Sequence, residues 1–189
     1  MKIGVALSGG GIRGIAHAGV LQALENNGIH IDIIGGTSAG SMIASLYAMG
    51  YSPEEIYLLF RKNAKKIVGM NVLPIISGLK SFVNKSSPIM NGFRNGKNIE
   101  ELYNEIAREK GIETLTQIKM PIVIPSVDIM ESKEYIFTNI VPEKEDKSQY
   151  ITDISVGKAV RASSSFPAVF NVCNIHKHAF MDGGALDNV

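Results

Sequence analysis

Two short apolar segments of the chain each run into a glycine-rich turn, and each turn opens a helical pattern. Residues 3–7 lead to three consecutive glycines, and residues 31–34 lead to Gly36-Thr37-Ser38-Ala39-Gly40. Apolar runs of this length, bounded by glycine, are typical of strands buried on both faces. Strand, helix, strand and helix joined by short connections predict a parallel sheet in a layered α/β fold.

Further elements follow from periodicity and from end signals. Ser52-Pro53-Glu54-Glu55 has the residues of a capping box, and glycine stands where the helices at 14–27 and 41–49 should end. Asn98 with Glu101 is expected to open another helix, which Gly111 ends. We therefore predict helices at 14–27, 41–49, 52–66, 98–111 and 152–162, and strands at 3–7, 31–34, 121–127, 134–137 and 180–182.

Composition narrows the class of protein. The 189 residues suit one domain, and 45% hydrophobic with 20% charged residues is a globular composition. A net charge of +1 gives no electrostatic argument for nucleic acid. The one cysteine, Cys173, is expected to be a small buried apolar residue. No run approaches the roughly 18 apolar residues of a membrane span, so we expect a cytoplasmic protein that touches membranes only from the side.

Two segments remain open at this stage. Residues 141–150 are polar and charged, which favours an exposed loop. Residues 67–93 are apolar and broken by glycine and proline. They suit either a mobile cover over an active site or short core helices joined by turns.

The first glycine turn matches a dinucleotide-binding fingerprint. Gly9-Gly10-Gly11-Ile12-Arg13-Gly14 satisfies Gly-x-Gly-x-x-Gly, and Asp32 follows about twenty residues on. In the dinucleotide fold, however, the ribose-binding acid stands at the end of the second strand, whereas Asp32 stands at its start. The alternative use of such a loop is to direct backbone N–H groups at one oxyanion.

The second turn has the pattern of a nucleophile elbow. Gly36-Thr37-Ser38-Ala39-Gly40 is Gly-x-Ser-x-Gly between a strand and a helix, a setting that lifts the serine hydroxyl out of the sheet. Both turns follow the carboxyl ends of neighbouring parallel strands, where open α/β sheets bind ligands. The glycine loop is therefore expected beside Ser38, where an oxyanion hole would have to be.

The base is less obvious from the residues alone. None of the four histidines (His17, His30, His176 and His178) has a recognisable orienting partner, and only His17, one turn beyond the glycine loop, is kept as a reserve candidate. Asp182, at a strand end before Gly183 and Gly184, could be aimed at a neighbouring group. By themselves these three residues equally suit an ordinary Asp-Gly turn.

Taken together, the motifs resemble the bacterial patatin-like phospholipase family. The resemblance rests on Leu7-Ser8-Gly9-Gly10-Gly11-Ile12-Arg13-Gly14, Ala16-His17-Ala18-Gly19-Val20-Leu21, the Ser38 pentapeptide, Arg161-Ala162-Ser163 with Phe166-Pro167, and Asp182-Gly183-Gly184. It covers the whole chain and is weakest at 67–93 and 131–150. It implies a three-layer α/β/α fold with a mainly parallel central sheet.

The resemblance also implies a lipid acyl hydrolase of the phospholipase A or lysophospholipase type. Ser38 and Asp182 would form the catalytic dyad, and Gly9, Gly10 and Gly11 the oxyanion hole. The supporting positions would be Arg13, Gly14, Gly36, Gly40 and Gly183. The substrate would be a phospholipid or another lipid ester. No cofactor is expected, and no cluster of carboxylates, histidines or cysteines that would hold a metal is recognised.

Three other functions stay open: an acyltransferase with the same site, a nicotinamide- or flavin-binding oxidoreductase module, and a lipid-binding protein with an inactive site. We expect residues 1–189 to form a single domain. Since members of the family continue beyond this aspartate with a strand and a helix, we also expect the chain to be a fragment that is less active than an extended version.

Overall fold

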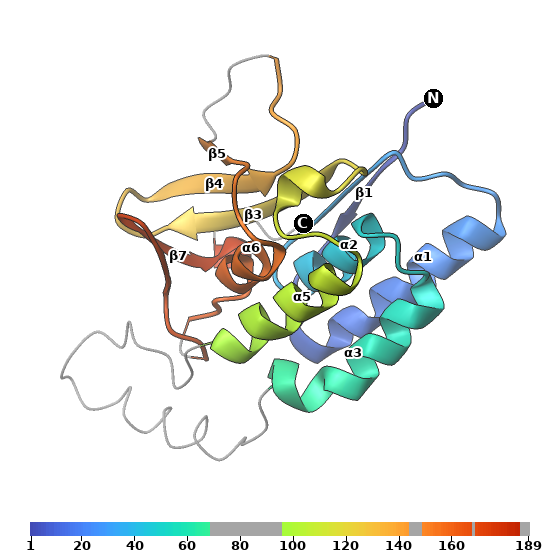
Figure 1. The fold of residues 1–189 in the computed structure, drawn as a ribbon, viewed down its shortest axis with the longest axis horizontal. Helices are drawn as coiled ribbons and strands as arrows, with labels where there is room; N and C mark the ends of the chain where they lie inside the picture. Colours follow the sequence, from blue (N-terminus) through green and yellow to red (C-terminus); the bar gives the residue numbers. More distant parts are fainter. Residues whose placement is uncertain (69–95, 144–148, 168, 186–189) are drawn as a thin grey trace.

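The computed structural model describes residues 1–68, 96–143, 149–167 and 169–185 (Figure 1). The strands are β1 (Gly4–Leu7), β2 (Ile33–Gly36), β3 (Ile122–Asp128), β4 (Lys133–Thr138), β5 (Gln149–Ile151), β6 (Cys173–Ile175) and β7 (His178–Asp182). The helices are α1 (Ala16–Asn26), α2 (Ala39–Ala48), α3 (Pro53–Val68), α5 (Lys97–Glu109) and α6 (Val156–Ser163). The short helical turns are η1 (Gly11–Ile15), η2 (Leu115–Gln117) and η3 (Gly183–Ala185).

The seven described strands form one sheet built on a parallel core. Its order is β1-β2-β3-β4-β5, with β7 beside β3 and β6 beside β7. The pairs β1–β2, β2–β3 and β4–β5 are parallel, and the remaining pairs are antiparallel. The predicted α/β class with a sheet built on parallel strands is confirmed.

One face of the sheet carries the core. Leu7, Ile34 and Ile122 point to that face and are at most 2% exposed. Helices α2 and α6 pack on it, and α1, α3 and α5 lie outside them. On the opposite face Ala6 is exposed and Val123 is half-buried.

The apolar run of the first strand predicts burial on both faces, and this prediction is wrong: one face of β1 is exposed. The described helices cover one face of the sheet, whereas a three-layer α/β/α arrangement would place helices on both. The exposed face of β1 carries only small residues, Gly4 and Ala6, and a run of apolar letters does not distinguish such a face from a buried one.

Most helix ends match the expectation. Ser52 N–H donates to Glu55 Oε2 (2.8 Å) and Glu55 N–H to Ser52 Oγ (3.2 Å), which is the predicted capping box. Gly28, Gly50 and Gly111 all have positive φ after helix ends. Asn98, by contrast, is not a cap, because Gly96 in the left-handed region begins α5 without a side-chain cap.

Other boundaries differ by a few residues. Helix α6 begins at Val156, because Ser155 caps it by accepting from the Lys158 N–H. Strand β2 begins at Ile33 and not at residue 31. The short strands β5 and β6 have no counterpart in the prediction, since three residues are too few to show a period.

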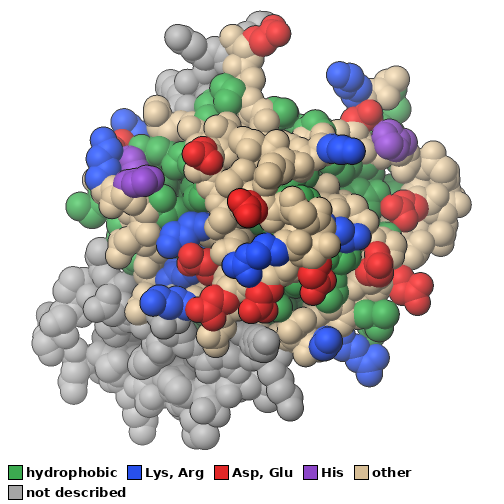
Figure 2. Space-filling model, in the orientation of Figure 1, with side chains coloured by type: hydrophobic (Ala, Val, Ile, Leu, Met, Phe, Trp, Pro, Cys, Tyr) green, Lys and Arg blue, Asp and Glu red, His purple; other side chains and the backbone are tan. Residues whose placement is uncertain are grey.

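Two of the open segments lie largely outside the described residues. These are most of 67–93 and residues 144–148 of the expected loop, whose last two residues, 149 and 150, belong to strand β5 and not to a loop. Cys173 is buried, as predicted. None of the described helices combines the length and the apolar character that crossing a bilayer requires. On the face drawn in Figure 2, acidic and basic side chains are interspersed over α5, and Lys158 and Glu100 form an ion pair at 3.3 Å.

Candidate active site

Ser38 stands on a sharp turn between β2 and α2. Its backbone has φ 53° and ψ −120°, in a region that side-chain-bearing residues rarely adopt. The turn depends on close backbone approach. A Cβ on Gly36 would overlap the backbone of Gly40, and a Cβ on Gly40 would overlap the carbonyl oxygen of Leu7. Both glycines of the pentapeptide are thus required by packing around the serine.

The turn is held in place by a second serine. The Ser38 N–H donates to Ser163 Oγ at 3.1 Å, which ties the elbow to the end of α6. Arg161-Ala162-Ser163 is one of the segments that carry the family resemblance. The sequence gives no sign that Ser163 contacts Ser38, and the structure shows this contact. Helix α2 begins directly after Ser38, so its positive end lies at the candidate nucleophile.

Two strands bring Ser38 and Asp182 together along one edge of β3. Parallel β2 pairs with Ile122 and Val123, while antiparallel β7 pairs with residues 126–128. The two strands therefore run toward each other, and their carboxyl ends meet beside the middle of β3. Ser38 follows one end and Asp182 is the other, which explains how residues 144 positions apart (182 − 38 = 144) share a site.

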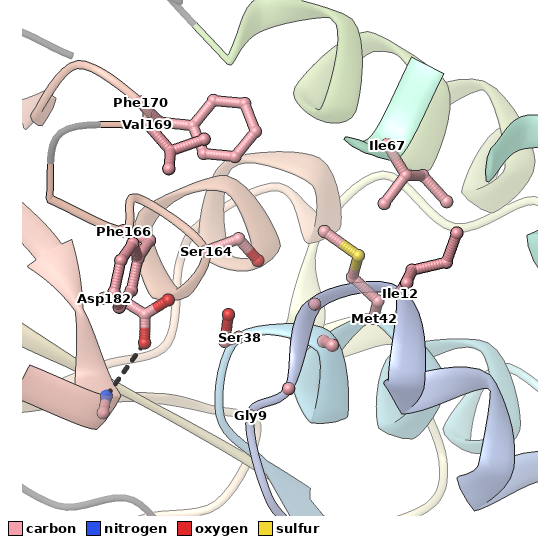
Figure 3. A pocket seen from close by; sticks show the side chains of 14 residues that line it. Gly9, Ile12, Ser38, Met42, Ile67, Ser164, Phe166, Val169, Phe170 and Asp182 are labelled. Carbon is pink, nitrogen blue, oxygen red and sulfur yellow. Dashed lines mark hydrogen bonds between the residues drawn. The ribbon is translucent and has the colours of Figure 1, made fainter. Parts of the chain in front are cut away.

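Asp182 is held firmly but is not saturated with hydrogen bonds. It is 2% exposed, its N–H donates to Ser165 O (3.1 Å), and its Oδ1 accepts from the Gly184 N–H (2.9 Å). Within the described residues Oδ2 has no hydrogen-bond partner. Figure 3 shows the carboxylate and the Ser38 hydroxyl on the same side of the cavity. Gly183 packs so closely that a Cβ there would lie 2.6 Å from Pro125 O.

Burial changes the acidity of this carboxyl group. Desolvation raises the pKa of Asp182, and the neighbouring Ser38 hydroxyl and the Gly184 N–H oppose the rise without cancelling it. Desolvation by burial is the largest of these effects on the pKa of Asp182. A carboxylate with a raised pKa is a stronger proton acceptor.

The glycine loop lies against the same cavity. Gly9, Gly10 and Gly11 line it together with Ser38 and Asp182. Gly11 has φ 59°, which allows the backbone to turn into η1. A Cβ on Gly14 would lie 2.6 Å from the Cβ of Ala39, so this glycine lets η1 approach the start of α2.

Arg13 differs from the other loop positions. It is exposed, and it is not among the described residues that line the cavity. Its backbone N–H donates to Gly10 O at 3.2 Å, so within the described residues Arg13 contacts the loop through its main chain.

The remaining walls of the cavity are apolar. Its volume is about 450 Å³, within the range of roughly 300–1,000 Å³ usual for small-molecule sites. The apolar lining residues are Ile12, Ala39, Met42, Ile67, Phe166, Val169 and Phe170 (Figure 3). A hydrocarbon chain is the kind of ligand that such walls favour.

The histidines require one correction. His17 Nε2 donates to the backbone oxygen of Ser8 at 2.9 Å, so this nitrogen has a structural partner. His178, for which no partner was recognised, lies with Nδ1 2.7 Å from Oδ2 of buried Asp128. Glu131 joins them to form a group with ligand atoms within 4.8 Å of one another. The expectation that no such cluster exists was wrong, because residues 50 positions apart meet across β3 and β7.

This cluster is not part of the candidate site. His178 precedes Asp182 by four residues on an extended strand, which is about 13 Å at roughly 3.3 Å per residue. Asp128 Oδ1 already accepts from the N–H groups of Met130 and Ala179 at 3.1 Å each. Burial by itself would raise the pKa of Asp128, but the hydrogen bonds from His178 and from these two amides outweigh it, so the pKa lies below its ordinary value.

Asp32 does not occupy the position of a ribose-binding acid. Its Oδ2 accepts from the Ile3 N–H at 2.7 Å. Asp32 directly precedes β2, so it lies at the amino end of this strand, whereas the glycine loop follows the carboxyl end of the neighbouring β1. The carboxyl end of β2 leads directly into Thr37 and Ser38. The geometry thus does not favour the dinucleotide alternative.

Sequence relatives cover part of the chain. A stretch of 65 residues is 52% identical to the lysophospholipase NTE1 of Meyerozyma guilliermondii, and likewise 52% identical to that of Saccharomyces cerevisiae. Each match spans 34% of this chain and 4% of the relative, so the chain corresponds to a small part of these proteins. The relatives are fungal, and the expected resemblance to bacterial members in particular is not supported by them.

Two solved structures and a family model match a larger part of this chain than the sequence relatives do. VipD from Legionella pneumophila superposes with a TM-score of 0.55 at 16% identity over 100% of this chain and 47% of VipD. ExoU, in its complex with SpcU from Pseudomonas aeruginosa, gives 0.53 at 23% identity over 89% and 37%. At these identities the two structures show the shared fold only. The model of the patatin-like phospholipase family matches residues 5–189, and this chain therefore belongs to that family.

Proposed function

We propose that this chain is a lipid acyl hydrolase of the phospholipase A or lysophospholipase type, with Ser38 as nucleophile and Asp182 as its base. The observation that carries the proposal is the meeting of β2 and β7, which puts a strained serine beside a buried, partly unpaired carboxylate in an apolar cavity. Membership of the family and the name of the fungal relatives support the same reaction class.

Acylation follows from this geometry. Asp182 accepts the proton of Ser38 as its oxygen attacks the ester carbonyl, and the carbonyl oxygen becomes an oxyanion. The N–H groups of Gly10 and Gly11 are the proposed donors to it, aided by the positive end of α2. Collapse of the intermediate breaks the ester bond, and the proton held by Asp182 passes to the departing alcohol.

Deacylation reverses these roles with water. Asp182 removes a proton from a water molecule that attacks the acyl-serine, the glycine loop again stabilises the oxyanion, and the proton returns to Ser38. The fatty acid leaves and the site is restored. Each turnover consumes one water and needs no other reactant.

The entrance of the cavity supports contact with a lipid surface. Ile12 and Phe166 line the cavity, yet 51% and 58% of their surfaces remain exposed. Large exposed apolar side chains beside a site of this kind favour insertion at a membrane interface. Exchanging Phe166 for serine should weaken binding to phospholipid vesicles and leave hydrolysis of a soluble short-chain ester nearly unchanged.

A labelling experiment tests the chemistry. A fluorophosphonate should label Ser38, and Ser38→Ala should lose both labelling and turnover of lysophospholipid and simple esters while remaining folded. Asp182→Asn should lower the rate about a hundredfold or more, whereas His17→Gln should have little effect. Labelling that maps to Ser41, or a crippling effect of His17→Gln, would refute the assignment. Formation of acylglycerol when glycerol is present would instead indicate an acyltransferase.

A further inference from the structure

Three consecutive serines end α6, and only the middle one has a hydroxyl without a partner. Ser163 Oγ accepts from the Ser38 N–H at 3.1 Å. Ser165 Oγ donates to Arg161 O at 2.8 Å and accepts from Arg161 Nη1 at 2.9 Å. Ser164 is 4% exposed, and its Oγ has no hydrogen-bond partner among the described residues. A buried hydroxyl of this kind costs stability, so its presence calls for an explanation.

The position of Ser164 supplies one. It lines the same cavity as Ser38 and Asp182, and Figure 3 shows its hydroxyl directed into that cavity. Among the lining residues that the structure describes, it is the only polar side chain besides those two. A ligand in the cavity can therefore offer this hydroxyl a hydrogen bond that the described part of the protein does not.

The shape of the cavity limits the ligand. Its volume of about 450 Å³ gives room for an acyl chain beside Ser38, and Ser164 lies on the wall next to that chain. A glycerolipid with a single acyl chain carries a free hydroxyl on the carbon next to its ester. In a lipid with two chains, a second ester and its chain occupy that place.

We propose that Ser164 is a specificity-determining residue whose hydroxyl binds the free hydroxyl beside the ester of a monoacyl glycerolipid. The inference rests on the proposed function, because it assumes that Ser38 attacks that ester. Serine can both donate and accept, so it pairs with an alcohol in either direction. A site built to bind a substrate hydroxyl discriminates against an analogue that lacks it, because its own polar group is then left unpaired.

Three substrates with the same acyl chain test the proposal. They are a lysophosphatidylcholine with a free 2-hydroxyl, its 2-deoxy analogue, and a monoacylglycerol that has the hydroxyl but no phosphate. The wild-type chain should favour the lysophospholipid over the deoxy analogue by about tenfold in kcat/KM, the order expected for one hydrogen bond. If the monoacylglycerol is also favoured over the deoxy lysophospholipid by about tenfold, the hydroxyl is recognised and not the head group.

Two variants separate recognition from structure. Ser164→Ala should lose about tenfold on the hydroxylated substrates, keep its rate on the deoxy analogue, and unfold at a slightly higher temperature, because it removes an unpaired buried hydroxyl. Ser165→Ala, which breaks the bonds to Arg161, should lower the unfolding temperature and affect all three substrates alike. Both variants remove one hydroxyl from the same turn, so they are matched in chemistry.

The outcomes are distinct. Equal losses for Ser164→Ala on all three substrates, or equal wild-type rates on the hydroxylated and deoxy lipids, would overturn the role of Ser164 while leaving the hydrolase intact. A wild-type chain that hydrolyses none of these esters and no simple ester would instead refute the proposed function itself.

Discussion

The strained backbone of Ser38 makes a measurable prediction about stability. We expect Ser38→Gly to be more stable than Ser38→Ala, although neither variant can form an acyl-enzyme. The two differ only in a Cβ at a residue with φ 53° and ψ −120°, so the comparison isolates the backbone. A side-chain-bearing residue in such a region costs about 1–3 kcal/mol, and the greater freedom of glycine in the unfolded chain returns about 0.5–1 kcal/mol. The expected net difference in free energy of unfolding is therefore about 1 kcal/mol in favour of glycine, within a range of about 0–2.5 kcal/mol.

Urea and thermal unfolding followed by circular dichroism would measure this difference. For a domain of this size, 1 kcal/mol corresponds to about 2–4 °C in the unfolding midpoint, which is the shift expected for the central value. The matched pair Ser41→Gly and Ser41→Ala, inside α2, should show the opposite order, because glycine is unfavourable in a helix interior. If the Ser41 pair behaves so and Ser38→Gly is still no more stable than Ser38→Ala, the strain at the elbow is absent and the argument fails.

Three further predictions follow from the site. Because burial raises the pKa of Asp182, hydrolysis should increase with pH through a midpoint above the ordinary 3.8. Asp182→Asn, besides its loss of rate, should be more stable than the wild type at neutral pH, and equal or lower stability there would contradict the sign. Gly40→Ala should lower the free energy of unfolding by about 1–3 kcal/mol and remove most activity, because its Cβ would overlap Leu7 O. Gly19→Ala, which has open space around its Cβ, should raise the free energy of unfolding by up to about 1 kcal/mol. Unfolding midpoints that shift in the same direction would contradict this. Excess EDTA should leave hydrolysis unchanged, since the cluster at Asp128 lies outside the cavity; activity that calcium alone restores would overturn it.

The two glycine turns of the candidate site could be located from the sequence because their motifs are local. A strand, a glycine turn and a helix are decided within a few residues, so the elbow at Ser38 and the loop at Gly9 could be placed from spacing alone. Asp182 was more difficult, since an Asp-Gly turn has no preferred partner. Its approach to Ser38 depends on β7 meeting β2 along β3, and pairing between distant strands leaves no local signal.

The missed features share that cause. The contact between Ser163 and Ser38 joins residues 125 positions apart, and the pair of His178 with Asp128 joins residues 50 apart. Periodicity and capping rules describe one element at a time, so they cannot show which side chains meet when two elements pack. The partner of His17 could not be predicted for another reason: Ser8 O is a backbone atom, and every residue has one.

The costs in this fold are concentrated where the chemistry is proposed. In the described residues four buried side-chain atoms have no hydrogen-bond partner, and two of them, Ser164 Oγ and Asp182 Oδ2, belong to residues that line the cavity. A third, Thr37 Oγ1, directly precedes Ser38, which itself has a strained backbone. An apolar residue at position 164 would remove an unpaired hydroxyl, and an amide at 182 would remove a buried charge, so stability alone does not favour the residues present. An ester carbonyl could accept from the Ser164 hydroxyl, whereas Asp182 Oδ2 can only accept, and the proton donor that the proposed reaction gives it is the Ser38 hydroxyl.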